Sequence, residues 1–69
     1  MEIKNRVKEL RARHNLTQGE LADDVDVTRQ TIVALEKGNY VPSLMLAMKI
    51  ARIFKLPIEE IFYWEDDEV

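Results

Sequence analysis

Residues 17–38, TQGELADDVDVTRQTIVALEKG, carry two helix-start signals that lie eleven positions apart. Thr17 followed by Glu20 has the spacing of a capping box, in which the hydroxyl accepts from the third helical N–H and the carboxylate reaches back. Thr28 supplies the second N-cap. Because only a tight turn fits between helices that start so close together, the segment predicts two short helices joined by a turn.

Apolar residues at helical spacing predict three further helices and therefore an all-α, five-helix fold. We expect the five helices at about residues 3–14, 18–25, 29–37, 44–55 and 58–62. Gly38 stands where a left-handed residue is wanted after the third helix, and Pro57 follows the end of the fourth. Residues 1–62 form the single expected domain, and residues 63–69 form a short acidic tail.

The composition argues against several classes of protein. The 69 residues include no cysteine and one histidine, His14, which we interpret as a solvent-facing residue at the end of the first helix. Without a metal spacing, a glycine-rich phosphate loop or a nucleophile–base pair, we expect no metal, cofactor, small-molecule ligand or enzymatic activity. Without a long apolar run or a signal peptide, we expect no membrane contact and a cytoplasmic protein.

The net charge of −3 comes from one end of the chain. Residues 1–40 hold seven basic and seven acidic residues, whereas residues 41–69 hold three basic and six acidic ones. Charge distribution matters more than its sum when a partner is inferred. The negative total therefore does not argue against a nucleic-acid partner for the helix pair.

The first turn of the second paired helix presents polar side chains in the geometry that places them in the major groove of DNA. Arginine pairs well with guanine and glutamine with adenine, while small apolar side chains contact the thymine methyl group. We therefore expect base contacts from Arg29, Gln30, Thr31, Val33 and Ala34. A phosphate or solvent contact for Arg29, and a plain surface amide for Gln30, are the alternatives.

The string LTQGELADDVDVTRQTIVALEKGNYVPSL, followed by AMKIARIF and LPIEEIF, resembles the lambda-repressor/Cro-like (xenobiotic-response-element, XRE) helix-turn-helix family over residues 3–62. The resemblance implies a DNA-binding transcriptional regulator. It also implies an internal ion pair between Arg11 and Glu36, which would orient the second helix rather than touch bases. The chain departs from the family pattern at Asp26, where glycine is usual, and a left-handed Asp costs about 1 kcal/mol relative to Gly.

Phosphate contacts are expected from helix N-termini and from the loop that follows the third helix. Gln18 resembles the glutamine with which this family contacts a phosphate. The further candidates for phosphate contact are Thr17, Thr28, Lys37, Asn39, Tyr40 and Ser43, and Arg13 is a weaker one. For Tyr40, covering the core is an equal alternative.

The helix expected at 44–55 is apolar nearly all round, and a chain of this length covers only one side of it. So few basic residues also give a single subunit little electrostatic affinity for DNA. Both points predict a homodimer that binds two half-sites about 34 Å apart on a near-palindrome. The expected dimer interface consists of Met45, Leu46, Ile50, Ile53, Ile58, Ile61, Phe62, Tyr63 and Trp64. Packing of Trp64 on its own core is the alternative.

The acidic residues Glu65–Glu68 have three interpretations: a solvated tail, repulsion of non-specific DNA, or contact with a partner's basic stripe of Lys49, Arg52 and Lys55. The function predicted for the whole chain is that of a transcriptional regulator, in the first instance a repressor, that binds double-stranded DNA as a homodimer. An antitoxin-type autorepressor with a protein partner, and a protein-interaction module without DNA binding, are the alternatives.

Overall fold

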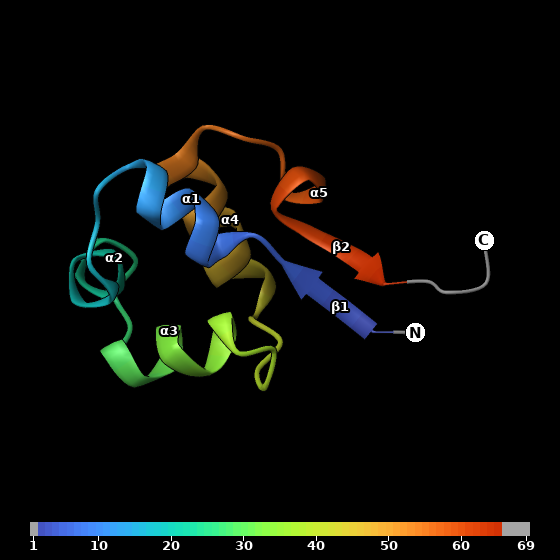
Figure 1. Ribbon diagram of the computed structural model, residues 1–69, viewed down its shortest axis with the longest axis horizontal. Helices are drawn as coiled ribbons and strands as arrows, with labels where there is room; N and C mark the ends of the chain where they lie inside the picture. The colour runs from blue at the N-terminus through green and yellow to red at the C-terminus, as the bar shows by residue number, and fades with distance from the viewer. Residues whose placement is uncertain (1, 66–69) are drawn as a thin grey trace.

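The part of the chain that the structure describes folds into five helices and a two-stranded antiparallel sheet (Figure 1). The computed structural model describes residues 2–65. In chain order the elements are β1 (Glu2–Asn5), α1 (Val7–Arg13), α2 (Gln18–Asp24), α3 (Arg29–Glu36), α4 (Leu44–Phe54), α5 (Ile58–Ile61) and β2 (Phe62–Glu65). All five predicted helices are present, and the sheet is an element that the all-α prediction lacked. Helices α2 to α5 begin at the predicted residues and each ends one residue early.

Side-chain caps explain why the predicted helix starts are accurate. The Glu20 N–H donates to Thr17 Oγ at 3.0 Å, and the Thr17 N–H donates to Glu20 Oε1 at 2.8 Å, which completes the predicted capping box. The Thr31 N–H donates to Thr28 Oγ at 3.3 Å at the start of α3. Ser43 Oγ accepts the N–H of the third residue of α4 in the same way. Each hydroxyl satisfies a backbone donor that the helix itself leaves unpaired.

Helix α1 begins at Val7, four residues later than the sequence predicts. The spacing of Ile3, Val7 and Leu10 fits a helix, but Ile3 lies in β1 and pairs with Trp64 of β2. Asn5, the last residue of β1, also stabilises the start of α1, because its Oδ1 accepts the Val7 N–H at 3.1 Å. The prediction is wrong here because a partner strand far along the chain decides the conformation.

The last described residues also differ from the prediction. Phe62, expected at the end of the fifth helix, has extended backbone angles and opens β2. The predicted boundary between residues 62 and 63 therefore falls inside a strand that pairs with the start of the chain. Residues 66–69, which complete the predicted acidic tail, lie outside the described residues.

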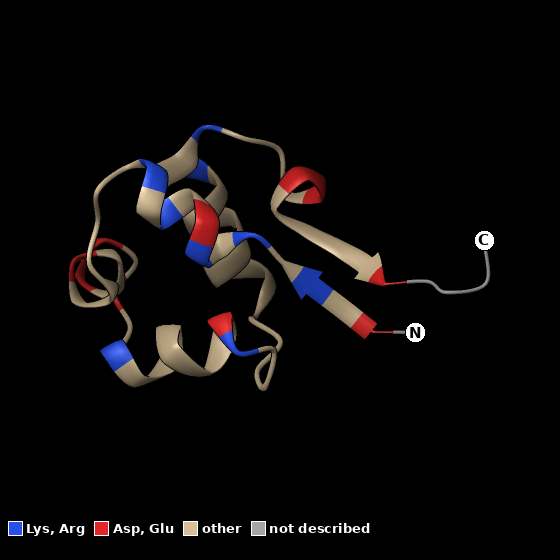
Figure 2. Ribbon diagram, in the orientation of Figure 1, with Lys and Arg blue, Asp and Glu red and all other residues tan. Residues whose placement is uncertain are grey.

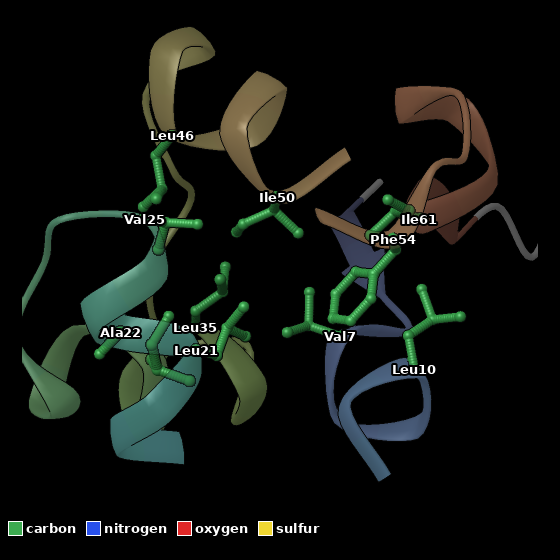
Figure 3. Close-up of a cluster of buried hydrophobic side chains, with 11 residues drawn as sticks. Val7, Leu10, Leu21, Ala22, Val25, Leu35, Leu46, Ile50, Phe54 and Ile61 are labelled. Atoms are coloured by element: carbon green, nitrogen blue, oxygen red, sulfur yellow. The ribbon is translucent and has the colours of Figure 1, made fainter. Parts of the chain in front are cut away.

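The hydrophobic core lies between α1, α2, α3, α4 and the end of α5 (Figure 3). Its buried side chains are Val7, Leu10, Leu21, Ala22, Val25, Ile32, Leu35, Leu46, Ile50, Phe54 and Ile61. Three of them, Leu46, Ile50 and Ile61, belong to the predicted dimer interface. That part of the prediction is wrong, because these side chains fill the core of their own protomer and offer no surface to a second one.

Four residues adopt positive φ angles at the ends of helices. Gly38 has φ of 81° after α3, and Asp26 has φ of 62° in the turn between α2 and α3, as the sequence predicts for both. Asn15 and Lys55 adopt the same region after α1 and α4, with φ of 56° and 58°. The turn residue Asp26 therefore holds a conformation that glycine adopts at lower cost.

Candidate nucleic-acid interface

Helices α2 and α3 form one tightly packed unit. The turn between them is closed by backbone bonds, including Val27 N–H to Ala22 O at 3.0 Å. Ala22 is almost fully buried in α2, and Ile32 and Leu35 of α3 are completely buried below it. Because the small Ala22 side chain lets the helices approach closely, α3 is held at a fixed angle and its outer face remains open.

The outer face of α3 carries the predicted base-contacting residues. Ile32 and Leu35 point into the core, so the residues on the opposite side of this helix are Gln30, Val33, Ala34 and Lys37, at successive helical turns. Gln30 is exposed, whereas Val33 and Ala34 are half-buried. Thr31 lies toward the side of the helix, where its hydroxyl hydrogen-bonds with Thr28 Oγ at 3.1 Å.

Arg29 lies at the edge of this face, beside α2. Together with Arg11, Thr17, Gln18 and Gly19 it lines an open cleft of about 410 Å³. The cleft contains the first turn of α2, whose leading backbone N–H groups have no acceptor within the helix. Arg29, the side-chain amide of Gln18 and these N–H groups give the cleft the donors that a phosphate group requires.

An ion pair between Arg11, which lines the cleft, and Glu36 holds the end of α3 in place. Arg11 Nε donates to Glu36 Oε2 at 2.7 Å, and Arg11 Nη2 donates to Glu36 Oε1 at 3.2 Å. The Gln18 amide also donates to Glu36 Oε1, at 3.2 Å, and Arg11 Nη1 donates to Leu16 O at 2.9 Å. The pairing implied by the family resemblance is thus present, and it joins α1, α2 and α3.

Asn5 also holds α3 in place by a hydrogen bond, and the sequence did not predict this role. Its Nδ2 donates to the Leu35 backbone carbonyl at 2.9 Å, while its Oδ1 accepts the Val7 N–H. One side chain therefore accepts the first N–H of α1 and satisfies a carbonyl in the last turn of α3. The signal for the first bond is an asparagine two positions before a helix start, because its side chain can hydrogen-bond the backbone two residues on.

The comparisons with known proteins agree with this geometry. The family model described as "Helix-turn-helix" (HTH_3) matches residues 7–61, from the first residue of α1 to the last residue of α5. The chain belongs to the XRE-type helix-turn-helix family. Helices α2 and α3 are the two helices of the motif, and α3 occupies the position that is called the recognition helix in this family.

Several relatives are similar over their full length. An uncharacterized HTH-type transcriptional regulator of Methanocaldococcus jannaschii is 59% identical over 66 residues, which cover 96% of this chain and all of that protein. YgzD of Bacillus subtilis, also an uncharacterized HTH-type transcriptional regulator, is 52% identical and aligns over 94% of this chain and 98% of its own length. Among solved structures, a proposed DNA-binding protein from Bacteroides fragilis has the same fold, with a TM-score of 0.78 at 23% identity, covering 87% of this chain and 97% of that one.

The predicted phosphate-contacting residues of this helix-turn-helix protein fall into two groups. The hydroxyls of Thr17, Thr28 and Ser43 already accept helix N–H groups, so Thr17 and Ser43 each have their own proton left to donate, whereas the Thr28 hydroxyl also shares a hydrogen bond with that of Thr31. Lys37, Asn39 and Tyr40 lie exposed at the end of the recognition helix and in the loop after it. Tyr40 is exposed in the protomer, which does not favour the alternative that it covers the core.

Charge is sparse on the recognition helix. Figure 2 shows that α3 is uncharged between its two ends, with Arg29 at the start and Glu36 at the end. Because the Glu36 side chain is only 4% exposed and bound by Arg11, it places no free negative charge on the outer face.

Within residues 2–65, no helix has the length and apolar character that crossing a membrane needs, and no group of three acidic, histidine or cysteine side chains is placed to hold a metal.

The structure divides the remaining residues of the predicted dimer interface by exposure. Met45, Tyr63 and Trp64 are exposed, whereas Ile53, Ile58 and Phe62 are half-buried. Trp64 is 61% exposed, so it does not pack onto its own core. Leu44 and Met48, which the prediction omitted, are 71% and 56% exposed on the same helix as Met45. The open apolar surface of α4 therefore lies at positions 44, 45 and 48.

Proposed function

We propose that this protein is a sequence-specific DNA-binding transcriptional regulator whose recognition helix α3 enters the major groove. The observation that carries the proposal is the way α3 is held. Its inner face packs on the core, the largely covered Glu36 side chain ties its last turn to Arg11, and its outer face is left open. A helix held in this way and open on one face presents base-contacting groups with little loss of conformational entropy on binding.

Base contacts come from the first turn of α3 in this proposal. Arg29 and Gln30 are exposed there, and each side chain carries the donors that pair with a purine in the major groove. Val33 and Ala34 follow one turn later on the outer face and offer small apolar surfaces for a thymine methyl group. Thr31 contributes less to base recognition, because its hydroxyl hydrogen-bonds with that of Thr28.

Phosphate contacts set the position of α3 on the duplex. The Gln18 amide nitrogen carries two protons and gives one to Glu36, so its second proton is available to a phosphate oxygen. Gln18 and Arg29 line the same cleft, which places one neutral donor and one cation beside the start of α3. Lys37, Asn39 and Tyr40 supply the corresponding contacts at the other end of the helix.

A homodimer follows from the small electrostatic contribution of one subunit. Only two of the twelve proposed DNA-contacting residues, Arg29 and Lys37, are cationic. Because each phosphate contact releases about one counterion, two cations give limited affinity at physiological salt. We therefore propose that two copies bind inverted half-sites, with centres one helical turn of DNA apart. Repression is the favoured mode, since occupying an operator requires nothing beyond DNA binding.

Selection of bound sequences from a random pool of double-stranded DNA, at a stated salt concentration, tests the proposal. We expect an enriched near-palindrome whose half-sites are centred about 10 base pairs apart. Enrichment of a single half-site would contradict the homodimer and leave base recognition by α3 standing. Equal recovery of all sequences would contradict sequence-specific binding itself.

A further inference from the structure

An open apolar groove runs along α4 toward the start of α5. It has a volume of about 960 Å³, and its apolar floor includes Leu44, Met45, Met48 and Leu56. Three of these side chains are more than half exposed in the protomer. Methionine and leucine side chains that line a groove without a cover are typical of a surface that receives another apolar group.

The rim of this groove is basic. Arg52 and Lys55 lie along its edge, and both are exposed. Among the ion pairs formed within residues 2–65, Lys49 of the same rim pairs with Asp26, but neither Arg52 nor Lys55 has an acidic partner. The groove therefore combines an apolar floor with two cations that face solvent, and it fits a segment that carries an aromatic residue next to carboxylates.

The chain itself contains such a segment. Trp64 is exposed on β2, and the residues that follow it in sequence are Glu65, Asp66, Asp67 and Glu68. We propose that the groove on α4 and α5 receives this segment, Trp64 to Glu68, from a second copy of the protein. The Trp64 ring would lie on the apolar floor, and the carboxylates would pair with Arg52 and Lys55.

Trp64 of the same copy does not lie in this groove. Figure 1 shows that β2 leads away from the loop between α4 and α5, toward the far end of the sheet. Four strand residues carry the chain about 13 Å from the end of α5. The Trp64 side chain of the same copy lines a separate hollow with Ile3, Glu59 and Phe62, and it is not among the residues that line the groove on α4 and α5. A second copy is therefore the occupant that the geometry allows.

Exchange of the two segments would be reciprocal, so the contact closes as a two-fold symmetric dimer. This inference rests on the homodimer of the proposed function and names the surfaces that form it. It also assigns a purpose to the acidic excess at the end of the chain, which the DNA-binding face does not use. Since opposite charges near the surface attract over about 10 Å at 0.1 M salt, the dimer should weaken as salt rises.

Charge reversal in the full chain tests the inference. The groove variant is Arg52→Glu with Lys55→Glu, and the segment variant is Asp66→Lys, Asp67→Lys and Glu68→Lys. Glu65 is left unchanged because it pairs with Lys4 at 3.1 Å. A third variant combines both sets, and Lys8→Glu on the exposed side of α1 is the control. Sedimentation equilibrium gives the dimer Kd, and the emission of Trp64, the only tryptophan, reports its burial.

We expect each reversal to raise the dimer Kd about tenfold or more, and the combined variant to return to within about threefold of the wild type. Trp64 emission should shift to shorter wavelength as the wild-type protein dimerises, and the control should behave like the wild type. A wild-type dimer that both reversals leave unchanged, or that the combined variant fails to restore, would overturn this inference alone. A wild type that stays monomeric, with concentration-independent emission, would overturn the proposed homodimer as well.

Discussion

The Arg11 guanidinium on α1 binds both carboxylate oxygens of Glu36 at the end of α3, with Nε to Oε2 at 2.7 Å and Nη2 to Oε1 at 3.2 Å. The Glu36 side chain is 4% exposed and that of Arg11 is 16% exposed. The hydrogen bond that Arg11 donates to the Glu36 carboxylate raises the pKa of Arg11 above its ordinary value, so the guanidinium stays charged. The recognition helix is therefore positioned by a nearly buried ion pair rather than by apolar packing alone.

Arg11→Ala should lower the free energy of unfolding by about 3 kcal/mol, because it leaves the Glu36 carboxylate buried without its partner. Urea denaturation monitored by circular dichroism measures the change. Replacing both residues together, as Arg11→Met with Glu36→Leu, should cost clearly less, since no charge is then left unpaired. A loss below about 0.5 kcal/mol for Arg11→Ala, the level of an exposed pair, would contradict this role.

Asn5→Ala should lower the free energy of unfolding by about 1–2 kcal/mol, because it removes the bonds to the Leu35 carbonyl and the Val7 N–H. Asn5→Asp keeps the acceptor for the Val7 N–H but places a carboxylate oxygen against the Leu35 carbonyl oxygen, so it tests the bond to Leu35 specifically. Chemical denaturation should find both variants less stable than the wild type. Equal stability of all three proteins would show that the Asn5 bonds do not support the fold.

Asp26→Gly should stabilise the protein by about 0.5–1 kcal/mol, because the left-handed conformation costs glycine less than aspartate. The substitution also removes the ion pair of Asp26 with Lys49 at 3.3 Å, but Asp26 is 79% exposed and the pair contributes little. Thermal unfolding should show a Tm higher by a few degrees. Asp26→Asn is the control: asparagine tolerates the same conformation without the charge, so its Tm gives the contribution of the ion pair with Lys49. A Tm for Asp26→Gly at or below that of the wild type would contradict the expectation.

Local signals in the sequence are sufficient to predict most of the fold. Thr17, Thr28 and Ser43 predict the starts of three helices correctly, because each cap satisfies a backbone donor within three residues. The start of α1 was predicted wrongly for the opposite reason. Ile3 fits the helical spacing of Val7 and Leu10, but its strand exists only because residues near the other end of the chain pair with it.

In the candidate site too, some features could be predicted from local sequence and others depend on distant parts of the chain. The exposed first turn of α3 follows from the caps, and the resemblance supplied the pair of Arg11 and Glu36. The sequence alone did not tell which side of α4 faces the core, because that helix is apolar nearly all round. Leu46 and Ile50 turned out to be buried, while the equally apolar Met48 is exposed. Only the positions of the neighbouring helices decide between such residues.

Gln18→Ala should weaken binding to matched and unmatched DNA by the same factor, because a phosphate contact carries no sequence information. It also removes one hydrogen bond to Glu36, so the variant's stability must be measured in parallel. Fluorescence anisotropy with a selected site and a scrambled duplex gives both affinities. A change in the ratio of the two affinities would assign Gln18 to base recognition instead.

Arg29→Ala and Gln30→Ala test whether the first turn of α3 recognises bases. The measurement is the affinity of each variant, at one salt concentration, for the selected site and for that site with single base changes. We predict that each variant loses about 1–3 kcal/mol of discrimination at one base position, with the two positions different, and keeps discrimination elsewhere. If both variants retain the wild-type ratio of affinities at every position, α3 does not recognise DNA through these residues.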